Sequence, residues 1–315
     1  MITTLGETGL RVTRIGLGLA ALGRPGYINL GHALDLDGHT DVASMEHGAH
    51  AVLDAAYAGG VRYFDAARSY GEAETFLGSW LSSRGFGRDD VTVGSKWGYT
   101  YTADWRVDAE VNEVKDLTAA TFRRQLAETR ERLGDHLRLY QIHSATLDSG
   151  VLEDRSVLDE LAALRATGVL IGLSTSGAEQ GATIERAIEV GGFDSVQSTW
   201  NLLERSAGPA LAAAHAAGMG VIIKEALANG RLTDRGDVPA LVAAAGEAGV
   251  TPDALALAFV LEQPWVDVVL SGATTVPELS SNLRALAVDV GVGAFDGIVE
   301  EPDAYWKHRA ELPWN

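Results

Sequence analysis

The sequence predicts a (β/α)8 TIM barrel, an α/β fold in which parallel strands alternate with helices. About eight strand-like runs alternate with helical runs along the 315-residue chain. Eight such units over roughly 270 residues match one barrel in size and count. The competing doubly wound sheet carries G-x-G-x-x-G after its first strand, whereas IGLGLAALG spaces its glycines as G-x-G-x-x-x-x-G. Because no obvious linker divides the series, we expect a single domain over residues 1–315.

The first half of the chain is expected to open with an N-terminal β-hairpin, because a Gly-Glu-Thr-Gly turn separates two short extended pieces. The buried-strand pattern RIGLGLAAL follows, and then a long polar insertion over residues 23–43. The loop over residues 98–117 is rich in Tyr, Trp and acids. The periodicity predicts helices over 44–57, 72–83 and 118–133, and strands over 61–65, 91–96 and 137–143.

The second half repeats the alternation. Ser156 and Asp159 resemble a capping box, and Pro252 follows Thr251 as a proline does at a first helical position. The expected helices are 156–168, 182–190, 209–217, 238–248, 252–262 and 277–287, and the expected strands are 169–174, 195–199, 220–224 and 266–271.

Composition excludes several classes of protein. The formal net charge is −18, which disfavours binding to nucleic acid or to an anionic membrane. The chain has no cysteine, so a disulfide framework and cysteine-bound metals are not expected. The first ten residues lack a signal-peptide pattern, and no apolar run reaches the ~18 residues of a membrane span. We therefore expect a cytoplasmic protein, and the acidity by itself indicates no particular partner.

Four ionisable residues of different types follow successive predicted strands. Residues 61–71, VRYFDAARSYG, end a strand on Asp65 and place Tyr70 in the next turn. Lys96 ends the following strand and His143 the one after it. Any one of them could cap a helix or pack in the core. Because catalytic residues of a barrel come from the carboxyl ends of different strands, the four together predict an active site.

These residue types suit proton transfer to a carbonyl oxygen. A free phenol has a pKa of about 10, and a nearby ammonium lowers the pKa of a phenol. Asp65 would orient Lys96, Lys96 would tune Tyr70, and His143 would position the carbonyl. Tyr70 then protonates the developing alkoxide. The four groups supply no electrons, so a reduction requires a hydride-donating cofactor.

The chain resembles the aldo-keto reductases over nearly its whole length. The matching segments, in the order of that family, are RIGLGLAALG, YFDAARSYG, GSKWG, LYQIHS, IGLSTSG, SVQSTWNLL and GATTVPELSSNL. The resemblance implies a barrel that reduces carbonyls or oxidises alcohols with a nicotinamide dinucleotide. It assigns Asp65, Tyr70, Lys96 and His143 to the catalytic tetrad of the family.

The resemblance also implies a cofactor site. Ser174 and Gln197 would contact the nicotinamide carboxamide, and Trp200 would stack on the nicotinamide ring in place of a family tyrosine. Gly18 and Leu19 would line the nicotinamide side of the cleft. The remaining candidates for cofactor contact are Asp65, Thr175, Lys224, Glu225, Leu227, Ser271, Gly272, Ala273, Thr274, Glu278 and Asn282, the last of them on the adenine.

Departures from the family pattern leave the choice of cofactor open. Thr175 replaces a frequent asparagine, and Lys224-Glu225-Ala226-Leu227 replaces Tyr-Ser-Pro-Leu. Lys224 would either meet the cofactor pyrophosphate or be solvated at the rim. Glu278 would repel a 2′-phosphate, with Arg284 the nearest cation. NADP is the common choice of the family, and NAD is the alternative.

The remaining assignments concern substrate, metal and competing functions. Trp97, Tyr99 and Trp105 are expected to form a substrate wall. The histidines and aspartates of the insertion match no metal-ligand template, so no metal is expected. One competing function is a cofactor-sensing binding protein with little or no catalysis. Another is a Schiff-base lyase that uses Lys96 as its nucleophile.

Overall fold

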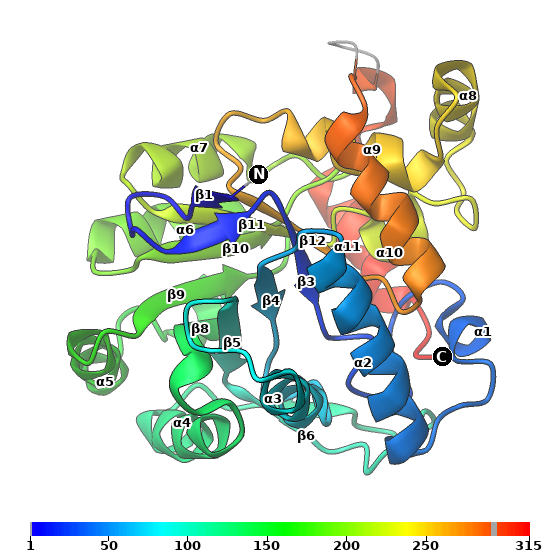
Figure 1. The fold of residues 1–315 in the computed structure, drawn as a ribbon. Coiled ribbons are helices and arrows are strands. Elements are labelled where there is room, and N and C mark those ends of the chain that lie inside the picture. Colours follow the sequence, from blue (N-terminus) through cyan, green and yellow to red (C-terminus); the bar gives the residue numbers. More distant parts are fainter. Residues whose placement is uncertain (1, 291–294) are drawn as a thin grey trace.

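A computed structural model describes residues 2–290 and 295–315 of the chain. Its centre is a closed barrel with strands in the order β10-β11-β12-β3-β4-β5-β8-β9 (Figure 1). All neighbouring strands of the barrel are parallel, as the strand–helix alternation predicts. The strands are β3 (Ile15–Gly18), β4 (Tyr63–Asp65), β5 (Thr92–Trp97), β8 (Leu137–Ala145), β9 (Leu170–Thr175), β10 (Ser195–Thr199), β11 (Gly220–Lys224) and β12 (Val268–Ser271).

Helices surround the barrel (Figure 1). They are α2 (Val42–Ala58), α3 (Ala73–Arg84), α4 (Ala119–Leu133), α5 (Arg155–Ala166), α6 (Gln180–Val190), α7 (Gly208–Ala216), α8 (Pro239–Ala248), α9 (Pro252–Leu261) and α10 (Val276–Leu283). Short 3₁₀ turns join them at Gly134–His136, Leu147–Ser149, Ala228–Gly230, Arg284–Ala287 and Asp296–Ile298. Within the described ranges, no single helix is both long and apolar enough to cross a membrane.

Caps account for several helix ends. Thr118 caps α4 by accepting a hydrogen bond from the backbone N–H of Thr121, and α4 stops before Gly134 as expected. The capping box expected at Ser156 is wrong. Asp154 caps α5 instead, because its carboxylate accepts hydrogen bonds from the N–H groups of Ser156 and Val157. Ser156 therefore lies inside the first turn of the helix.

The expected β-hairpin closes the amino-terminal end of the barrel. It pairs β1 (Ile2–Thr4) with β2 (Arg11–Thr13) in antiparallel fashion. Its apolar side chains form a buried cluster with inward residues of the strands, namely Leu5, Leu10, Val12, Tyr63, Leu139, Ile222, Val268 and Leu270. This plug keeps water from one end of the barrel interior, so the opposite, carboxyl end is left for a site.

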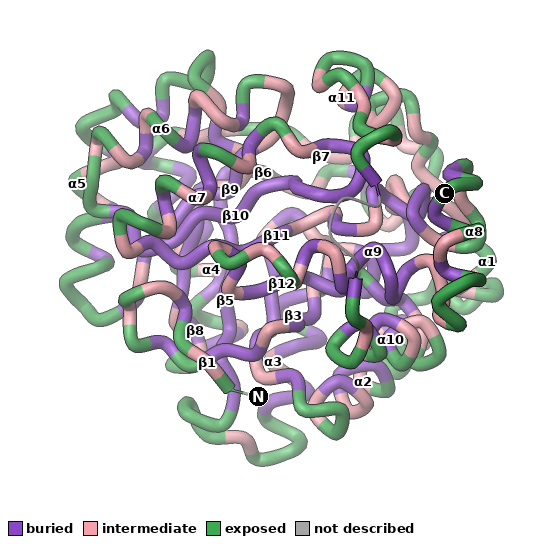
Figure 2. The backbone as a smooth tube through the Cα atoms, turned by 90° about the horizontal axis from the view of Figure 1, so that it is seen from above, coloured by how far each residue is buried: buried purple, intermediate pink, exposed green. Residues whose placement is uncertain are grey.

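A larger apolar core lies between the outer face of the barrel and the helices. Figure 2 shows the buried strands enclosed by helices whose outer turns are exposed. Phe64 of β4, for example, lies 5.2 Å from Trp80 of α3 between ring centroids. The barrel strands are therefore apolar on both faces, as is typical of parallel sheets.

Two short strands and two helices were not expected from the sequence. The loop after β5 folds into an antiparallel ribbon of β6 (Tyr99–Tyr101) and β7 (Glu113–Lys115). The insertion contains the one-turn helix α1 (His32–Leu36), and α11 (Pro302–Glu311) precedes the carboxyl terminus. Asn315 and Tyr27 exchange backbone hydrogen bonds of 3.2 Å, which tie the chain end to the insertion.

Candidate active site

The four predicted catalytic residues meet at the carboxyl end of the barrel. Asp65 is the last residue of β4, Lys96 lies near the end of β5, and His143 near the end of β8. Tyr70 lies in the turn that follows β4. Asp65 and Lys96 are both buried, each about 1% exposed. The barrel thus brings together residues that are up to 78 positions apart, from 65 to 143.

Asp65 is the acceptor at the centre of this cluster. It forms a buried ion pair with the Lys96 ammonium. Its Oδ2 accepts hydrogen bonds from Tyr63 Oη at 3.1 Å and from Gln197 Nε2 at 3.0 Å. Gln141 Nε2 lies 3.4 Å from the same oxygen. Several donors and one cation therefore surround this buried carboxylate.

Lys96 connects Asp65 to Tyr70. Its Nζ donates to the backbone oxygen of Ala66 at 3.1 Å and lies 3.4 Å from Tyr70 Oη. Tyr70 Oη is also 3.4 Å from His143 Nε2, and the two rings meet edge to face. One hydroxyl therefore lies between an ammonium and an imidazole, which is the arrangement needed for proton transfer.

The protonation states of Tyr70 and His143 follow from their burial. Burial first, and then the nearby Asp65 carboxylate, raise the pKa of Tyr70 well above its ordinary value. The nearby Lys96 predicts a fall in this pKa, but burial and the Asp65 carboxylate raise it instead. Burial, assisted by the charges of Lys96 and Lys224, holds the pKa of His143 well below its ordinary value. The site therefore contains a neutral phenol and a neutral imidazole at physiological pH.

Close packing at a glycine positions Tyr70. A Cβ added to Gly23 would lie 2.1 Å from the backbone oxygen of Tyr70 and 2.5 Å from the Cβ of Ala73. The backbone oxygen of Gly23 accepts a 2.8 Å hydrogen bond from the N–H of Glu72. A side chain at position 23 would therefore push the Tyr70 turn away from the barrel mouth.

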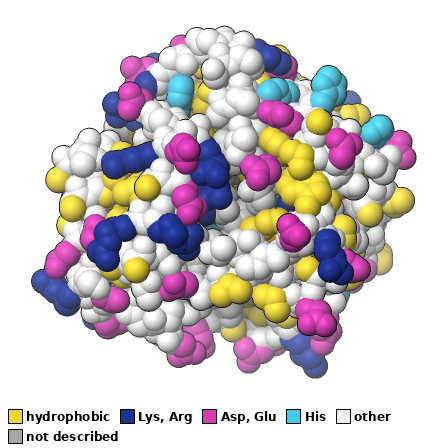
Figure 3. Space-filling model, turned by 90° about the horizontal axis from the view of Figure 1, so that it is seen from below, with side chains coloured by type: hydrophobic (Ala, Val, Ile, Leu, Met, Phe, Trp, Pro, Cys, Tyr) yellow, Lys and Arg dark blue, Asp and Glu magenta, His cyan; other side chains and the backbone are white. Residues whose placement is uncertain are grey.

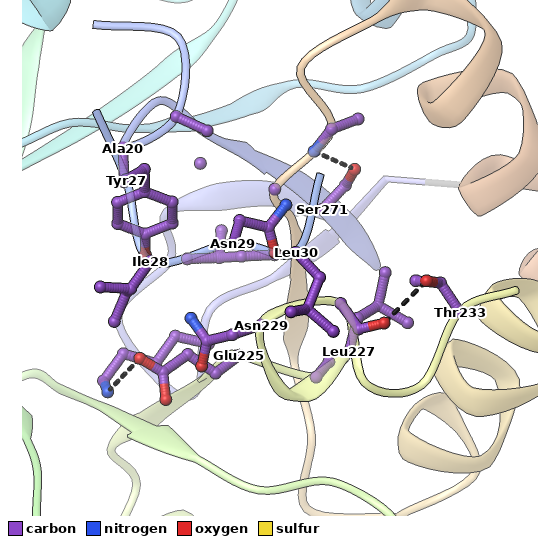
Figure 4. A pocket seen from close by; sticks show the side chains of 18 of the residues that line it. Ala20, Tyr27, Ile28, Asn29, Leu30, Glu225, Leu227, Asn229, Thr233 and Ser271 are labelled. Carbon is purple, nitrogen blue, oxygen red and sulfur yellow. Dashed lines mark hydrogen bonds and ion pairs between the residues drawn. The ribbon is translucent and has the colours of Figure 1, made fainter. Parts of the chain in front are cut away.

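A cavity of about 660 Å³ opens above these residues. Figure 4 shows Tyr27 and Asn29 on one side of it and Glu225, Leu227 and Asn229 on the other. Figure 3 shows one face of the molecule, on which basic and acidic side chains are interspersed. The predicted site residues in the cavity wall are Gly18, Asp65, Tyr70, Tyr99, His143, Gln197, Lys224, Glu225, Leu227, Ser271, Gly272, Ala273, Glu278 and Asn282.

Four predicted contact residues lie elsewhere for one shared reason. Successive side chains of a strand point to opposite faces. Gln197 points into the barrel, so Trp200, three positions later, points outward and stacks on Phe259 of α9 with a centroid distance of 5.6 Å. The Trp200 ring, expected from the sequence to stack on the nicotinamide, thus lies against Phe259 and not in the wall of the cavity.

The same alternation displaces Thr175, Trp97 and Leu19. Thr175 hydrogen-bonds to Ser198 at 2.9 Å on the outer face of the sheet. Trp97 follows the inward Lys96 and packs edge-on against Phe122 of α4. Leu19 is fully buried in the outer core. These three residues were expected to touch cofactor or substrate, and the structure places them behind the barrel wall.

Three other predicted contact residues are also held away from the cavity. Ser174 points inward, but its Oγ accepts a hydrogen bond from the backbone N–H of Ser144 at 2.8 Å. Trp105 turns toward the insertion, where Nε1 donates to the backbone oxygen of Thr40. Thr274 is buried beside α10. Packing of loops against one another decided these positions.

Residues from the insertion, from the loop after β11 and from the chain end also line the cavity, and the sequence pattern does not predict them. The cavity wall includes Arg24, Tyr27, Ile28, Asn29, Leu30, Asn229, Arg235, Arg309 and Trp314. Arg24 is only 2% exposed, and its guanidinium lies 5.3 Å from the Tyr70 ring centroid. The insertion was read as a solvated loop because it is polar.

The far end of the cavity is acidic. Glu278 caps α10 in a capping box with Thr275, and its Oε2 accepts from the N–H groups of Thr274 and Thr275 at 2.9 and 3.2 Å. Arg235 lies 3.6 Å from Glu278 and forms a two-oxygen ion pair with Asp35 of the insertion. Arg235, rather than the expected Arg284, is thus the cation beside Glu278.

The fold and the site define a class of protein, a parallel (β/α)8 barrel with proton-transfer groups at its carboxyl-terminal mouth. The chain belongs to the aldo/keto reductase family, whose model matches residues 14–291. It is therefore an NAD(P)H-dependent oxidoreductase.

Individual relatives agree with this membership. The chain is 26% identical to the "Uncharacterized oxidoreductase YrpG" of Bacillus subtilis, with 91% of each chain covered. It is 26% identical to D-threo-aldose 1-dehydrogenase of a Pseudomonas species, covering 93% of this chain and 94% of the relative. The holo structure of aldo-keto reductase AKR11C1 from Bacillus halodurans shares the fold, with a TM-score of 0.72 at 20% identity and coverage of 99% and 96%.

Proposed function

We propose that the chain transfers hydride between a nicotinamide cofactor and a small carbonyl or alcohol substrate, with Tyr70 as general acid and base. The observation that carries this proposal is the position of the Tyr70 hydroxyl, 3.4 Å from both Lys96 Nζ and His143 Nε2. A buried ion pair with Asp65 fixes the ammonium. The substrate oxygen would lie beside Tyr70 and His143, which both line the cavity.

In the reducing direction, Tyr70 delivers its proton to the oxygen of the carbonyl. Burial keeps the phenol protonated until an alkoxide, a much stronger base than the carbonyl, develops beside it. Lys96 then stabilises the phenolate, because its ammonium is already in contact with the hydroxyl. His143 is neutral and orients the carbonyl without adding charge. A nicotinamide cofactor, when bound, supplies the hydride.

The residues present fit a nicotinamide dinucleotide. The cavity runs from Tyr70 to the loop before α10, and Gly272 leaves open space at that end because nothing lies within 4 Å of an added Cβ. Asn229 Oδ1 is buried without a hydrogen-bond partner among the described residues and faces the same cavity. Gln197 and Asn282 also line it. We propose that these amides hold the cofactor at its two ends.

We further propose that discrimination between NAD and NADP is weak. The backbone N–H groups before α10 are the donors that would bind a 2′-phosphate, because helix N-termini attract anions. The Glu278 carboxylate already occupies two of those donors. Arg235 is the cation closest to Glu278, and Asp35 neutralises it. NADP remains the common choice of the family, but this end of the cavity offers it no unpaired charge among the described residues.

The substrate is proposed to be an aldehyde, ketone or sugar. The Pseudomonas relative is named for an aldose, which supports sugars as one candidate. A screen of carbonyls and alcohols with both cofactors, read as the change in nicotinamide absorbance, would test the reaction. Tyr70→Phe should lower turnover by at least ~10²–10⁴ and leave cofactor binding intact. Tyr57→Phe is the matched control, because Tyr57 packs on α3 outside the cavity.

A further inference from the structure

Lys224 is the one lysine among the described residues that line the cavity, and no carboxylate pairs with it alone. The neighbouring arginines, and Lys96 behind the cavity wall, are each paired with a carboxylate. The pairs are Lys96 with Asp65, Arg24 with Glu113, and Arg309 with Glu225. Lys224 therefore leaves one positive charge over in the wall of this cavity.

Glu225 is the nearest carboxylate to Lys224, but other groups already hold it. Arg309 donates to both oxygens of Glu225, with Nε at 3.0 and 2.9 Å. Thr199 Oγ1 donates to Oε2 at 3.0 Å. The Lys224 ammonium lies 3.8 Å from Oε1 and donates instead to Thr199 Oγ1 at 2.9 Å. Among the described residues that is its one hydrogen bond, so two of its N–H groups can serve a ligand.

The position of Lys224 places its charge in the substrate region. It ends β11 and pairs in register with Thr199, which has the same inward orientation as Gln197 two positions earlier. It lines the same cavity as Tyr70 and His143. The charge of Lys224 contributes to lowering the pKa of His143, so the two groups share one electrostatic environment. This lysine stands where the family pattern has the tyrosine of Tyr-Ser-Pro-Leu.

We propose that Lys224 binds a carboxylate carried by the substrate, so that the preferred substrates are carbonyl or hydroxy compounds with a second, anionic group. This inference rests on the proposed function and specifies its substrate class. The reaction itself is unchanged. The carbonyl carbon accepts hydride, the oxygen accepts the Tyr70 proton, and the carboxylate stays ionised against the ammonium. A charge-assisted hydrogen bond in a partly dehydrated site gives such a substrate its advantage.

The experiment compares meta- and para-carboxybenzaldehyde with the corresponding neutral carboxamides, at saturating cofactor. The wild type should favour the acids by roughly ten- to a hundredfold in kcat/KM, the value of a charge-assisted contact. Lys224→Met should remove the preference mainly through KM, because the contact exists before and during the reaction. Lys224→Arg should retain it. Lys307→Met, an exposed lysine on α11, controls for loss of net charge.

The pH dependence provides a second readout. Burial lowers the pKa of Lys224 from 10.5 to about 8. The preference for the acids should therefore be full below that pH and decline as the ammonium loses its proton above it. The carboxamides should show no such decline from this group. A preference that persists unchanged well above pH 8 contradicts the assignment.

Two results would overturn the proposal. One is equal kcat/KM for acids and amides in the wild type, or an equal preference in Lys224→Met. The other is a Lys224→Met variant that binds NADH about tenfold more weakly yet keeps the preference, since Lys224 would then serve the cofactor diphosphate. Benzoate gives a readout without turnover, and calorimetry should show tighter binding to the wild type with NAD than to Lys224→Met. If no carbonyl is reduced but benzoate still discriminates, the proposed function fails and the anion site stands.

Discussion

The Nζ of Lys96 lies 3.4 Å from the Oη of Tyr70, and the same ammonium is ion-paired with Asp65 below it. The Lys96 ammonium thus lies beside the phenol, while its charge is balanced by the Asp65 carboxylate. Burial first, and then the Asp65 carboxylate, raise the pKa of Tyr70 and retain its proton in the resting site, and the nearby ammonium can act when the phenolate forms. The following predictions test this arrangement and the other charged groups of the cavity.

Tyr70→Phe should lower turnover by at least ~10²–10⁴, the usual contribution of general acid–base catalysis. The substitution removes one hydroxyl and keeps the ring, so its edge-to-face contact with His143 remains. Cofactor titration should give the wild-type dissociation constant. Near-normal turnover with intact cofactor binding would defeat the mechanism.

Lys96→Met should lower both turnover and stability. The variant leaves the Asp65 carboxylate buried without its cation, a change that typically costs ~3–5 kcal/mol. Lys96→Met with Asp65→Asn should recover part of the unfolding free energy without recovering turnover. Adding Tyr70→Phe to Lys96→Met should reduce turnover little further, because the two residues act as one unit. Fully additive losses would show that they act independently.

Glu278→Arg should move the cofactor preference toward NADP. The substitution frees the N–H groups of Thr274 and Thr275 and adds a cation, a change worth roughly ten- to a hundredfold in relative affinity. The measurement is the ratio of dissociation constants for NADPH and NADH. Glu278→Gln serves as the neutral control. A wild-type preference for NADP of about a thousandfold or more would contradict the proposal that the Glu278 end of the cavity does not favour a 2′-phosphate.

Because of Glu225, the free energy of unfolding should decrease in acid. Burial alone would raise the pKa of this carboxyl, but Arg309 and Lys224 outweigh it and lower the pKa from 4.5 to about 2. Since the folded state binds the proton less readily than the unfolded state, the stabilisation is complete above about pH 4.5 and is lost as the pH falls toward 2. Its size is about 3 kcal/mol. Urea unfolding across this range should show a shallower decline for Glu225→Gln than for the wild type or for the exposed control Glu247→Gln.

Trp200 should contribute to the stability of the fold and not to the binding of the cofactor. Its indole packs between Phe259 and Trp265, so Trp200→Ala should destabilise the barrel by ~3–5 kcal/mol. Trp200→Phe keeps more of the packing and should fold well enough for cofactor titration. Its dissociation constant for NADH should equal that of the wild type. If Trp200→Phe instead binds NADH about tenfold more weakly than the wild type, Trp200 contacts the cofactor.

The sequence by itself determined the barrel and the four residues at its mouth. Alternating strands and helices are local patterns, and the position of a residue at the end of a strand can be counted along the chain. Asp65, Lys96 and His143 lie at strand ends in the sequence and in the structure. The closed topology then brings these ends together without further information, because parallel strands share one carboxyl edge.

Only the tertiary structure decided which side chains face the cavity. The barrel strands are buried on both faces, so their sequences are apolar runs without the alternation that would mark an inward side. Trp97 and Trp200 were expected on the cavity side of the wall, but a difference of one position along the strand places both on the side that faces the helices. The Arg309–Glu225 ion pair spans 84 positions of the chain, and the Tyr27–Asn315 contact spans nearly its whole length. No local pattern encodes such pairs, since they form only when folding brings distant segments to the same edge of the barrel.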